Sequence, residues 1–234
     1  MSTTPLPLML FAAGFGTRMG ALTKDRPKPL VHVAGQPLID HALALSGPQG
    51  TRRIVANAHY RAEMIQDHLA NRPDITVLHE YPEVLETAGG LRNALPSLGP
   101  GPVITLNSDA VWAGPNPLSA LEAAFQPAQM DALLLLVPPA NALGHAGAGD
   151  FTMASDGRLT RGPGHIYTGA QVIDPAILEG LPEGPVSLNA AWDIALQRKR
   201  LFGLIYQGRW VDVGQPTSIA LAEDLLRTAG AASD

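Results

Sequence analysis

The amino-acid sequence predicts an α/β protein with a doubly wound, mostly parallel β-sheet and a small antiparallel addition. Up to about residue 140, short apolar segments of strand length alternate with longer segments of helical periodicity. The first apolar segment runs directly into the glycines of residues 14–16, which is typical of a strand that ends beside a ligand. After residue 140 the segments shorten and flank Asp156-Gly157, which is a hairpin signal.

Five short apolar segments are expected to form buried parallel strands, because such strands are covered on both faces. They are residues 8–12, 53–57, 76–79, 103–106 and 133–137. The segments between them have the apolar spacing of helices, and two begin with a proline that suits a first helical turn. They are residues 37–45, 59–70, 87–95 and 117–125. This alternation implies right-handed crossovers, so ligands should gather at the carboxyl ends of the strands.

The second half of the chain is expected to add antiparallel strands that cover the open end of the sheet. A hairpin is predicted over residues 151–154 and 158–161, and a further strand over residues 166–173. Helices are predicted over residues 175–181, 188–198 and 216–228. We expect loops at residues 98–102 and 138–149, of which the second is a mobile lip, and a frayed tail over residues 229–234.

Composition indicates one large domain that carries its own binding site. The chain has 234 residues, with 16 Lys and Arg against 21 Asp and Glu and a net charge of −5, so we expect no nucleic-acid partner and no anionic membrane. Cysteine is absent, which excludes disulfides and thiolate chemistry and is compatible with a cytoplasmic location. The longest apolar run, residues 132–137, is far shorter than the roughly 20 residues of a membrane span. No Lys or Arg precedes Arg18, so a cleaved signal peptide is not expected.

A phosphate-binding loop is predicted at residues 14–18. Glycine has no Cβ and tolerates positive φ, so backbone N–H groups can approach an oligophosphate closely. Arg18 supplies charge, and Lys28 supplies more from between Pro27 and Pro29, which stiffen the segment. Alone, the two glycines fit a plain structural turn equally well. The loop is neither a Walker A motif nor a dinucleotide fingerprint, whose third glycine is replaced by Met19.

These motifs, with others spread over nearly the whole chain, resemble the signature of the sugar-1-phosphate nucleotidyltransferases. The matching segments are residues 14–19, 22–23, 27–30, 33–38, 85–90, 107–109, 149–151, 168–169 and 210–214. The compact length and the segments 85–87 and 149–151 are most similar to the N-acetylmuramate-1-phosphate uridylyltransferases of cell-wall recycling. Ala88 and Ser108 stand where that group usually has glycine, and Ala88 would change how the base is held.

Two aspartates are candidate ligands of Mg²⁺, a hard cation that prefers oxygen. Asp109 follows the strand at residues 103–106, and Asp212 lies between two valines. From the residues alone, an Asx-turn for Asp109 and an outward-facing strand residue for Asp212 are equally good interpretations. The resemblance, in which both positions match metal-binding aspartates, favours ligation of Mg²⁺.

The resemblance implies a Rossmann-like nucleotidyltransferase fold and a role for each matching residue. Arg18 would hold the departing pyrophosphate, and Lys28 would lie over the α-phosphate and the incoming sugar phosphate. The implied nucleotide-binding residues are Ala12, Ala13, Gly14, Gly16, Thr17, Glu86, Gly89 and Asn107. The implied sugar-binding residues are Asp150, Tyr167, Thr168 and Gly169. In this interpretation residues 1–234 form a single domain, with a nucleotide-binding half up to about residue 140 and a sugar-binding half after it.

The expected substrates are a nucleoside triphosphate and a sugar 1-phosphate, with UTP and N-acetylmuramate 1-phosphate as first choice. GTP with mannose 1-phosphate is the alternative pair, and the oligomeric state is left open. Thr87 is expected to cap a helix while Gly89-Gly90 admit a flat base, although a simple capped helix start is a second interpretation.

Other functional classes fit less well. A dinucleotide-dependent oxidoreductase needs a third glycine in register and an acidic residue roughly 20 positions further on. A non-catalytic nucleotide-sugar sensor would not need all four charged residues named above. His59, His145 and His165 lack metal-ligand spacing and are expected to be surface or loop residues, and no nucleophile-elbow pattern supports a hydrolase triad.

Overall fold

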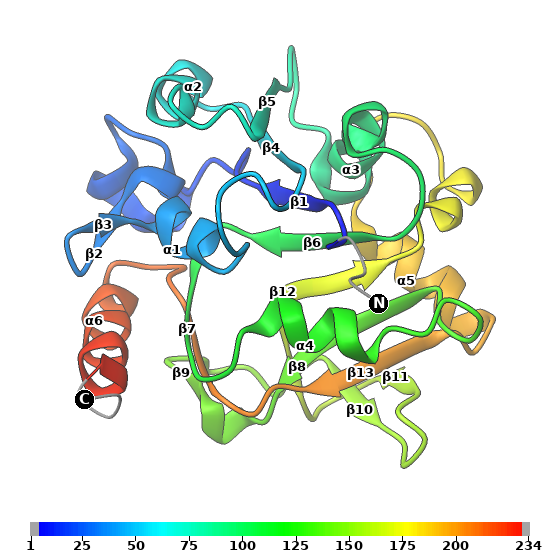
Figure 1. The fold of residues 1–234 in the computed structure, drawn as a ribbon. Coiled ribbons are helices and arrows are strands. Elements are labelled where there is room, and N and C mark those ends of the chain that lie inside the picture. Colours follow the sequence, from blue (N-terminus) through cyan, green and yellow to red (C-terminus); the bar gives the residue numbers. More distant parts are fainter. Residues whose placement is uncertain (1–4, 231–234) are drawn as a thin grey trace.

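The computed structural model describes residues 5–230, and within this range a seven-stranded sheet forms the centre of the protein (Figure 1). Its strand order is β13-β8-β12-β6-β1-β4-β5. The strands are β1 (Leu8–Phe11), β4 (Ile54–Ala58), β5 (Ile75–His79), β6 (Val103–Asn107), β8 (Ala132–Val137), β12 (Ile166–Ile173) and β13 (Leu201–Ile205). Only β12 of these seven is antiparallel to its neighbours, which confirms the mostly parallel sheet.

Three smaller sheets contain the other antiparallel strand pairs. The predicted hairpin is confirmed as β10 (Phe151–Met153) and β11 (Leu159–Arg161). A second sheet joins β7 (Ala110–Ala113), β14 (Arg209–Asp212) and β9 (Ala142–Leu143), and a third joins β2 (His32–Val33) and β3 (Gln36–Pro37). The short strand β9 lies inside the segment that was expected to be a loop.

The helices follow the expected order, with some changes at their ends. They are α1 (Leu38–Ala44), α2 (Ala62–Leu69), α3 (Glu86–Leu98), α4 (Pro117–Ala124), α5 (Leu188–Gln197) and α6 (Thr217–Gly230). Within the described residues the chain also forms the 3₁₀ helices η1 (Thr17–Thr23), η2 (Lys28–Leu30), η3 (Pro139–Asn141) and η4 (Pro175–Gly180). The α-helix predicted over residues 175–181 is therefore η4. The predicted frayed tail is helical to Gly230, and residues 231–234 lie outside the described range.

The placement of β12 corrects one expectation. Instead of covering the open end of the sheet, this strand lies between β6 and β8 in its middle. The physical reason is that Ala170, Val172 and Ile173 are all fully buried, and a strand without a polar face is stable only where both of its faces are covered. The edge strand β13, which the sequence analysis missed, pairs in parallel with β8.

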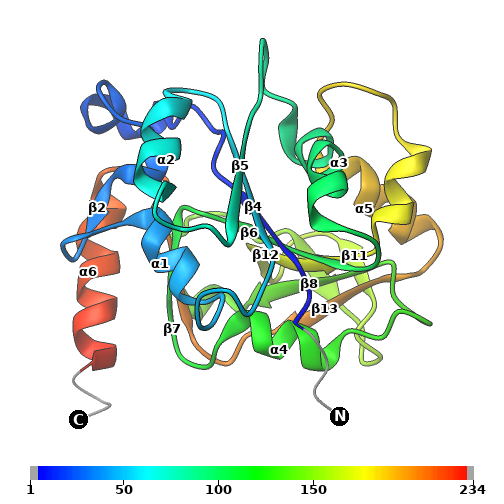
Figure 2. The same ribbon diagram turned by 45° about the horizontal axis from the view of Figure 1, so that its top comes forward.

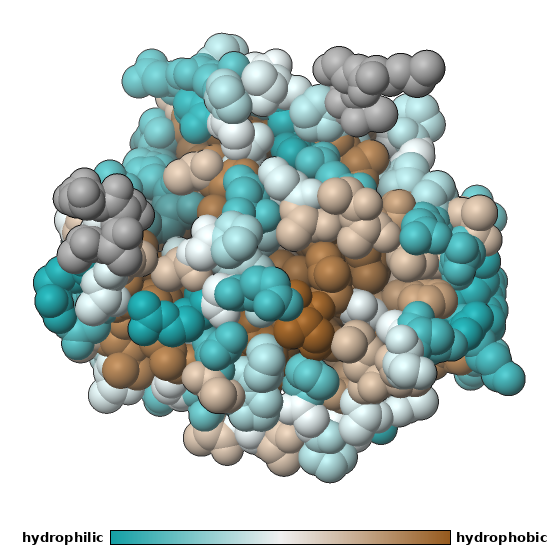
Figure 3. All heavy atoms as spheres, turned by 60° about the horizontal axis from the view of Figure 1, so that its bottom comes forward, coloured by the Kyte–Doolittle hydropathy of each residue, from teal (hydrophilic) through white to brown (hydrophobic). Residues whose placement is uncertain are grey.

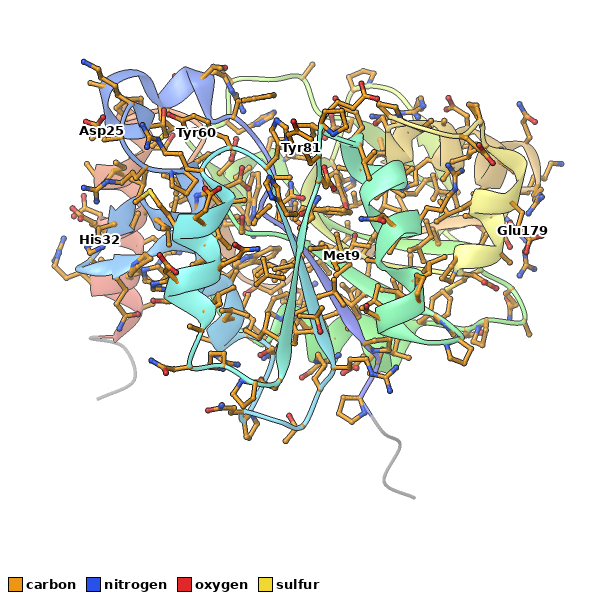
Figure 4. The ribbon with its side chains drawn as sticks, turned by 90° about the horizontal axis from the view of Figure 1, so that it is seen from above. Met9, Asp25, His32, Tyr60, Tyr81 and Glu179 are labelled. Atoms are coloured by element: carbon orange, nitrogen blue, oxygen red, sulfur yellow. The ribbon has the colours of Figure 1, made fainter. Side chains whose placement is uncertain are left out.

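Helices cover both faces of the sheet, as the doubly wound prediction requires. Leu8 and Leu10 of β1 pack into one apolar cluster with α1, α2 and α4. Met9, which points to the other face of the same strand, packs into a second cluster with α3, α5 and η4. Figure 4 looks along the sheet and shows α2 and α3 on opposite sides of the strand that carries Met9.

The carboxyl ends of the parallel strands meet several loops at one edge of the molecule. In Figure 2 the loop with η1, the turn before α3 and the segment before α5 all reach the upper edge. A different face, shown in Figure 3, has hydrophobic residues gathered toward its centre and hydrophilic residues around them. Within residues 5–230, no helix has the length and apolar character needed to cross a membrane.

Asp74, just before β5, is expected to contribute to stability through its pairing with Arg72. The Arg72 guanidinium donates to both Asp74 carboxylate oxygens, at 3.0 and 2.9 Å. These hydrogen bonds lower the pKa of Asp74 to about 2 from 3.8. The ion pair therefore stabilises the fold fully at pH values above the pKa of Asp74 in the unfolded chain. This stabilisation is lost as the pH falls through the pKa of about 2 that Asp74 has in the folded protein. Asp74→Asn should lower the free energy of unfolding by about 2 kcal/mol at pH 7, measured by urea denaturation.

The exposed Asp67 of α2 provides the matched control, because Asp67→Asn removes a carboxylate without an ion pair among the described residues. The destabilisation by Asp74→Asn should shrink between pH 4 and pH 2. A destabilisation of equal size at pH 7 and pH 2.5 would show that the ionised carboxylate is not its source.

Candidate functional site

Two adjoining cavities lie at the carboxyl ends of the parallel strands. The glycine-loop cavity has a volume of about 290 Å³, and the hairpin cavity has a volume of about 320 Å³. They share Phe11, Glu86, Thr87 and Asn107. The glycine-loop cavity is also lined by Ala12, Ala13, Gly14, Phe15, Lys28, Pro29, Asn57, Val84, Ser108 and Asp109. The hairpin cavity is also lined by Asp150, Phe151, Arg161, Tyr167, Ser187, Leu188, Asn189 and Trp192.

Lys28 is held under the glycine loop. Gly16 has φ +63°, and a Cβ on it would lie 2.7 Å from the Lys28 Cβ, so this position requires glycine for two reasons. The Lys28 side chain is only 10% exposed, and its ammonium donates to Asp109 Oδ2 at 2.6 Å. The predicted Gly16 and Lys28 therefore belong to one packed unit that points the ammonium at the first candidate metal ligand.

The second candidate ligand is brought to the first by antiparallel pairing of β7 with β14. Asp212 is opposite Ala110, and the Val213 N–H donates to the Asp109 carbonyl at 2.9 Å. Burial and then the negative charge of Asp109 raise the pKa of Asp212, while the charges of Lys28 and Arg18 act in the opposite direction. The two predicted aspartates are thus close enough to repel each other.

Arg18 lies close to Asp212, beside Gly214. A Cβ on Gly214 would lie 2.7 Å from Asp212 Oδ2 and 3.2 Å from Arg18 Nη2, so this glycine leaves room for both side chains. Arg18 and Asp212 line a further cavity of about 180 Å³ together with His145. Of the predicted residues, Thr17 is exposed at the start of η1 and does not line any of these cavities.

A buried hydrogen-bond network that the sequence analysis missed fixes the cavity wall. The Ala12 N–H donates to Asn57 Oδ1 at 2.8 Å, and Asn57 Nδ2 donates to Glu80 Oε1 at 2.7 Å. Glu80, which is 1% exposed, also accepts from the Leu85 N–H at 2.8 Å. This network ties the ends of β1 and β4 to the start of α3. The available signal was that Asn57 and Glu80 each stand at the end of an apolar strand.

The start of α3 differs from expectation. Thr87 does not cap the helix, because its hydroxyl accepts from the Leu188 N–H at 2.8 Å and the N-cap position is Leu85. Gly89 faces the segment before α5, where a Cβ would lie 2.6 Å from the Gly184 carbonyl oxygen. Gly89 therefore lines neither cavity, and the reason for glycine at this position is contact between two protein segments.

The two departures from the family pattern fit the fold without reshaping the cavities. Ala88 is fully buried in the cluster around α3, and its methyl group does not line either cavity. The Ser108 hydroxyl donates to the Phe11 carbonyl at 2.7 Å. Glu86, which lines both cavities, has φ +60°, a left-handed backbone conformation that is uncommon for a residue other than glycine.

The candidate sugar-binding residues are divided between the cavity and its support. Asp150 and Tyr167 line the hairpin cavity, and Asp150 Oδ2 accepts from the Tyr167 N–H at 2.8 Å. Thr168 is buried and donates to the Leu135 carbonyl at 2.8 Å, so its hydroxyl points away from the hairpin cavity. Gly169, at φ +83°, lets the Asn107 side chain pack closely, because a Cβ there would lie 2.7 Å from Asn107 Nδ2.

Of the three histidines considered above, His145 lines the same cavity as the candidate ligand Asp212, whereas His59 and His165 line none of these cavities. His59 Nδ1 is 2.8 Å from the Glu80 carbonyl oxygen, and its ring packs edge-on against Phe15. His145 is exposed, as expected. His165 differs, because its Nδ1 is buried without a hydrogen-bond partner among the described residues.

Comparison with known proteins agrees with this geometry. Residues 8–154 match the MobA-like NTP transferase domain family. The N-acetylmuramate alpha-1-phosphate uridylyltransferase of Caulobacter vibrioides is 38% identical over 98% of this chain and 100% of its own length. The mannose-1-phosphate guanylyltransferase catalytic subunit beta of Drosophila pseudoobscura pseudoobscura is 25% identical over 89% of this chain and 59% of its own.

The fold has a counterpart among solved structures. HddC from Yersinia pseudotuberculosis, complexed with GMP-PN, superposes with a TM-score of 0.74 over 94% of this chain and 99% of its own, at 20% identity. The family match covers more than half of the chain, and the resemblance predicted from its motifs is confirmed. This chain therefore belongs to the MobA-like NTP transferase family and is a nucleotidyltransferase.

Proposed function

We propose that this protein joins UTP and N-acetylmuramate 1-phosphate to give the nucleotide sugar and pyrophosphate. The observation that carries the proposal is a group of four charged residues near the two adjoining cavities. Lys28 and Asp109 form an ion pair that lines the glycine-loop cavity, and Asp212, which feels the charge of Asp109, lines a further cavity with Arg18. One cavity is assigned to the nucleotide and the other to the sugar. The full-length similarity to a uridylyltransferase supports this choice of substrates.

The reaction needs positioning and charge neutralisation more than proton transfer. A phosphate oxygen of the sugar 1-phosphate forms a bond to the α-phosphorus of UTP. The bond from that phosphorus to the bridging oxygen breaks, and the electron pair leaves with pyrophosphate. The attacking phosphate is already ionised at neutral pH, so no general base is required.

The charged residues have distinct proposed roles. Lys28 would stabilise negative charge that develops on the α-phosphate, from a stiff position that is 10% exposed. Arg18, which lines a cavity together with Asp212, would hold the pyrophosphate as it leaves. The backbone of residues 12–15, which lines the glycine-loop cavity, would contact the triphosphate and base. Asp150 and Tyr167, which line the hairpin cavity, would bind the sugar.

Magnesium is the proposed cofactor, with Asp109 and Asp212 as its protein ligands. Burial first, and then the charge of Asp109, raise the pKa of Asp212, so added positive charge would favour its ionised form. Within the described residues, no group of three or more His, Cys, Asp or Glu could hold a metal ion. Mg²⁺ commonly binds to one or two carboxylates together with phosphate oxygens of the substrate. When bound, the ion would neutralise charge on the phosphates.

We further propose a division of the chain, a location and a pathway for this reaction. Residues up to about 140 would serve the nucleotide and later residues the sugar, within one domain. The location would be the cytoplasm, where a cysteine-free chain needs no oxidising environment, and the pathway would be cell-wall recycling. The alternative pair, GTP and mannose 1-phosphate, is favoured less because the guanylyltransferase relative is more distant.

Pyrophosphate release in the presence of magnesium tests the proposal. The protein should use UTP with N-acetylmuramate 1-phosphate, and kcat/KM for UTP should exceed that for GTP by at least roughly tenfold, or about 1.4 kcal/mol. The physical reason is that a cavity shaped for one base edge leaves buried polar groups unpaired with another base. Equal or better use of GTP with mannose 1-phosphate would overturn the uridylyl assignment.

A further inference from the structure

The hairpin cavity has a strongly uneven distribution of charge. Among the described residues that line it, Arg161 is the one basic residue, while Glu86 and Asp150 are acidic. The Asp150 carboxylate already accepts a hydrogen bond from the Tyr167 backbone. An anionic substituent on a sugar in this cavity would be repelled by the acidic residues. It would therefore be stable only beside Arg161.

Arg161 is oriented by contacts from two other elements. Its guanidinium carbon lies 5.5 Å from the centre of the Phe151 ring in β10. From α5, Asp193 Oδ1 accepts from Nε at 2.9 Å and from Nη2 at 2.7 Å. Asn189 accepts from Nη1 through its side chain and from Nη2 through its carbonyl, both at 3.1 Å. These contacts fix the plane of the guanidinium at the cavity wall.

The guanidinium keeps capacity for a further acceptor. The four hydrogen bonds to Asp193 and Asn189 are those it makes in the described part of the chain, and an arginine has five N–H donors. The fifth is on Nη1. In addition, the Arg161 and Asp193 side chains are 41% and 57% exposed. An ion pair between side chains this exposed contributes little to the stability of the fold. A substrate carboxylate can therefore bind Arg161 together with Asp193, or can take the place of the Asp193 carboxylate.

The proposed sugar carries such a group. N-acetylmuramate differs from N-acetylglucosamine by a lactyl ether whose carboxylate is ionised at neutral pH. Arginine binds carboxylates through its planar fork of donors. We propose that Arg161 binds the lactyl carboxylate of N-acetylmuramate 1-phosphate and so selects this sugar phosphate over N-acetylglucosamine 1-phosphate. This inference rests on the proposed function of the hairpin cavity.

The experiment compares both sugar phosphates at saturating UTP in the wild-type protein and in R161Q. In R161Q, kcat/KM for N-acetylmuramate 1-phosphate should fall roughly 10- to 100-fold, the range for losing a hydrogen bond to a charged group. The fall should come mainly through KM. With N-acetylglucosamine 1-phosphate the change should stay within about threefold, because the partner of Arg161 is absent from that sugar.

Two variants distinguish carboxylate binding by Arg161 from a purely structural role, in which Arg161 only links the β10–β11 hairpin to α5. D193N breaks the same ion pair but keeps the cation, so it should retain the selectivity of the wild-type protein. R158Q removes the other arginine of the hairpin, which pairs with Asp156 and does not line the cavity. If R161Q and D193N lost activity equally on both sugars, Arg161 would be a structural tie and the proposal would be overturned.

The design also covers failure to fold and failure of the proposed function. R161K keeps the charge without the planar fork, so it should lose selectivity severalfold even if R161Q does not fold. In the wild-type protein, a substrate whose lactyl group is a neutral methyl ester should lose the advantage in kcat/KM that N-acetylmuramate 1-phosphate has over N-acetylglucosamine 1-phosphate. An undiminished kcat/KM for the ester would overturn the proposal. If the wild-type protein does not use N-acetylmuramate 1-phosphate, the proposed function fails and this inference falls with it.

Discussion

Asp212→Asn is expected to reduce kcat for nucleotidyl transfer by a factor of roughly 10³ or more, which is about 4 kcal/mol of lost transition-state stabilisation. The substitution keeps the shape of the side chain but removes one of the two anionic oxygen donors proposed for Mg²⁺. It also removes the mutual repulsion with Asp109, which contributes to the raised pKa of Asp212. The folded protein should therefore be as stable as the wild type, although inactive.

Asp212 gives a cleaner test than Asp109, because Asp109 also pairs with Lys28 at 2.6 Å. Pyrophosphate release at saturating magnesium measures kcat, and thermal unfolding checks the fold. Binding of Mn²⁺ in the presence of UTP, followed by electron paramagnetic resonance, should weaken in Asp212→Asn. The control is Asp224→Asn, an exposed carboxylate on α6. Near-native kcat in Asp212→Asn at saturating magnesium would show that Asp212 is not a metal ligand.

Lys28→Met is expected to lower kcat/KM by roughly 10²- to 10³-fold, the scale for loss of one preorganised electrostatic stabiliser. Methionine keeps an unbranched side chain against Gly16, where a Cβ would be only 2.7 Å from that of Lys28, and removes only the charge. The effect should appear mainly in kcat, because the ammonium is proposed to act on charge that develops during the reaction. Affinity for UTP, measured by calorimetry without sugar phosphate, should change little.

Lys24→Met is the matched control, because Lys24 is an exposed lysine that immediately follows η1 and does not line the cavities. The Lys28→Met variant also leaves Asp109 without its ion-pair partner, so the double variant Lys28→Met/Asp109→Asn should recover stability but not activity. A decrease in kcat/KM of less than about tenfold in Lys28→Met would contradict the assigned role.

Local sequence predicted those features that depend on a short stretch of backbone. The alternation of Leu8, Met9 and Leu10 between the two apolar clusters follows from strand periodicity alone. The position of Lys28 under the loop follows from its flanking prolines and from Gly16. These signals are local because backbone conformation and the alternation of side chains are set by neighbouring residues.

Gly89 shows that a glycine in a local motif can also be required for contact with a distant segment. The sequence predicts a glycine beside the base, whereas the structure puts Gly89 against Gly184 from a distant segment. The same residue type meets both demands, because each requires only that no Cβ be present. Only the position of the other segment decides between them.

Long-range pairing was decided by tertiary structure. Nothing near Asp109 in the sequence indicates that β14 brings Asp212 beside it, and nothing near Asn57 indicates Glu80 as its partner. Likewise, the apolar residues of β12 specify burial on both faces but not a place between β6 and β8. By itself the sequence determined the type of most elements, the phosphate loop and the candidate charged residues. Which strands pair, and hence which side chains meet across the cavities, depends on packing of the whole chain, because many strand partners satisfy the same local pattern.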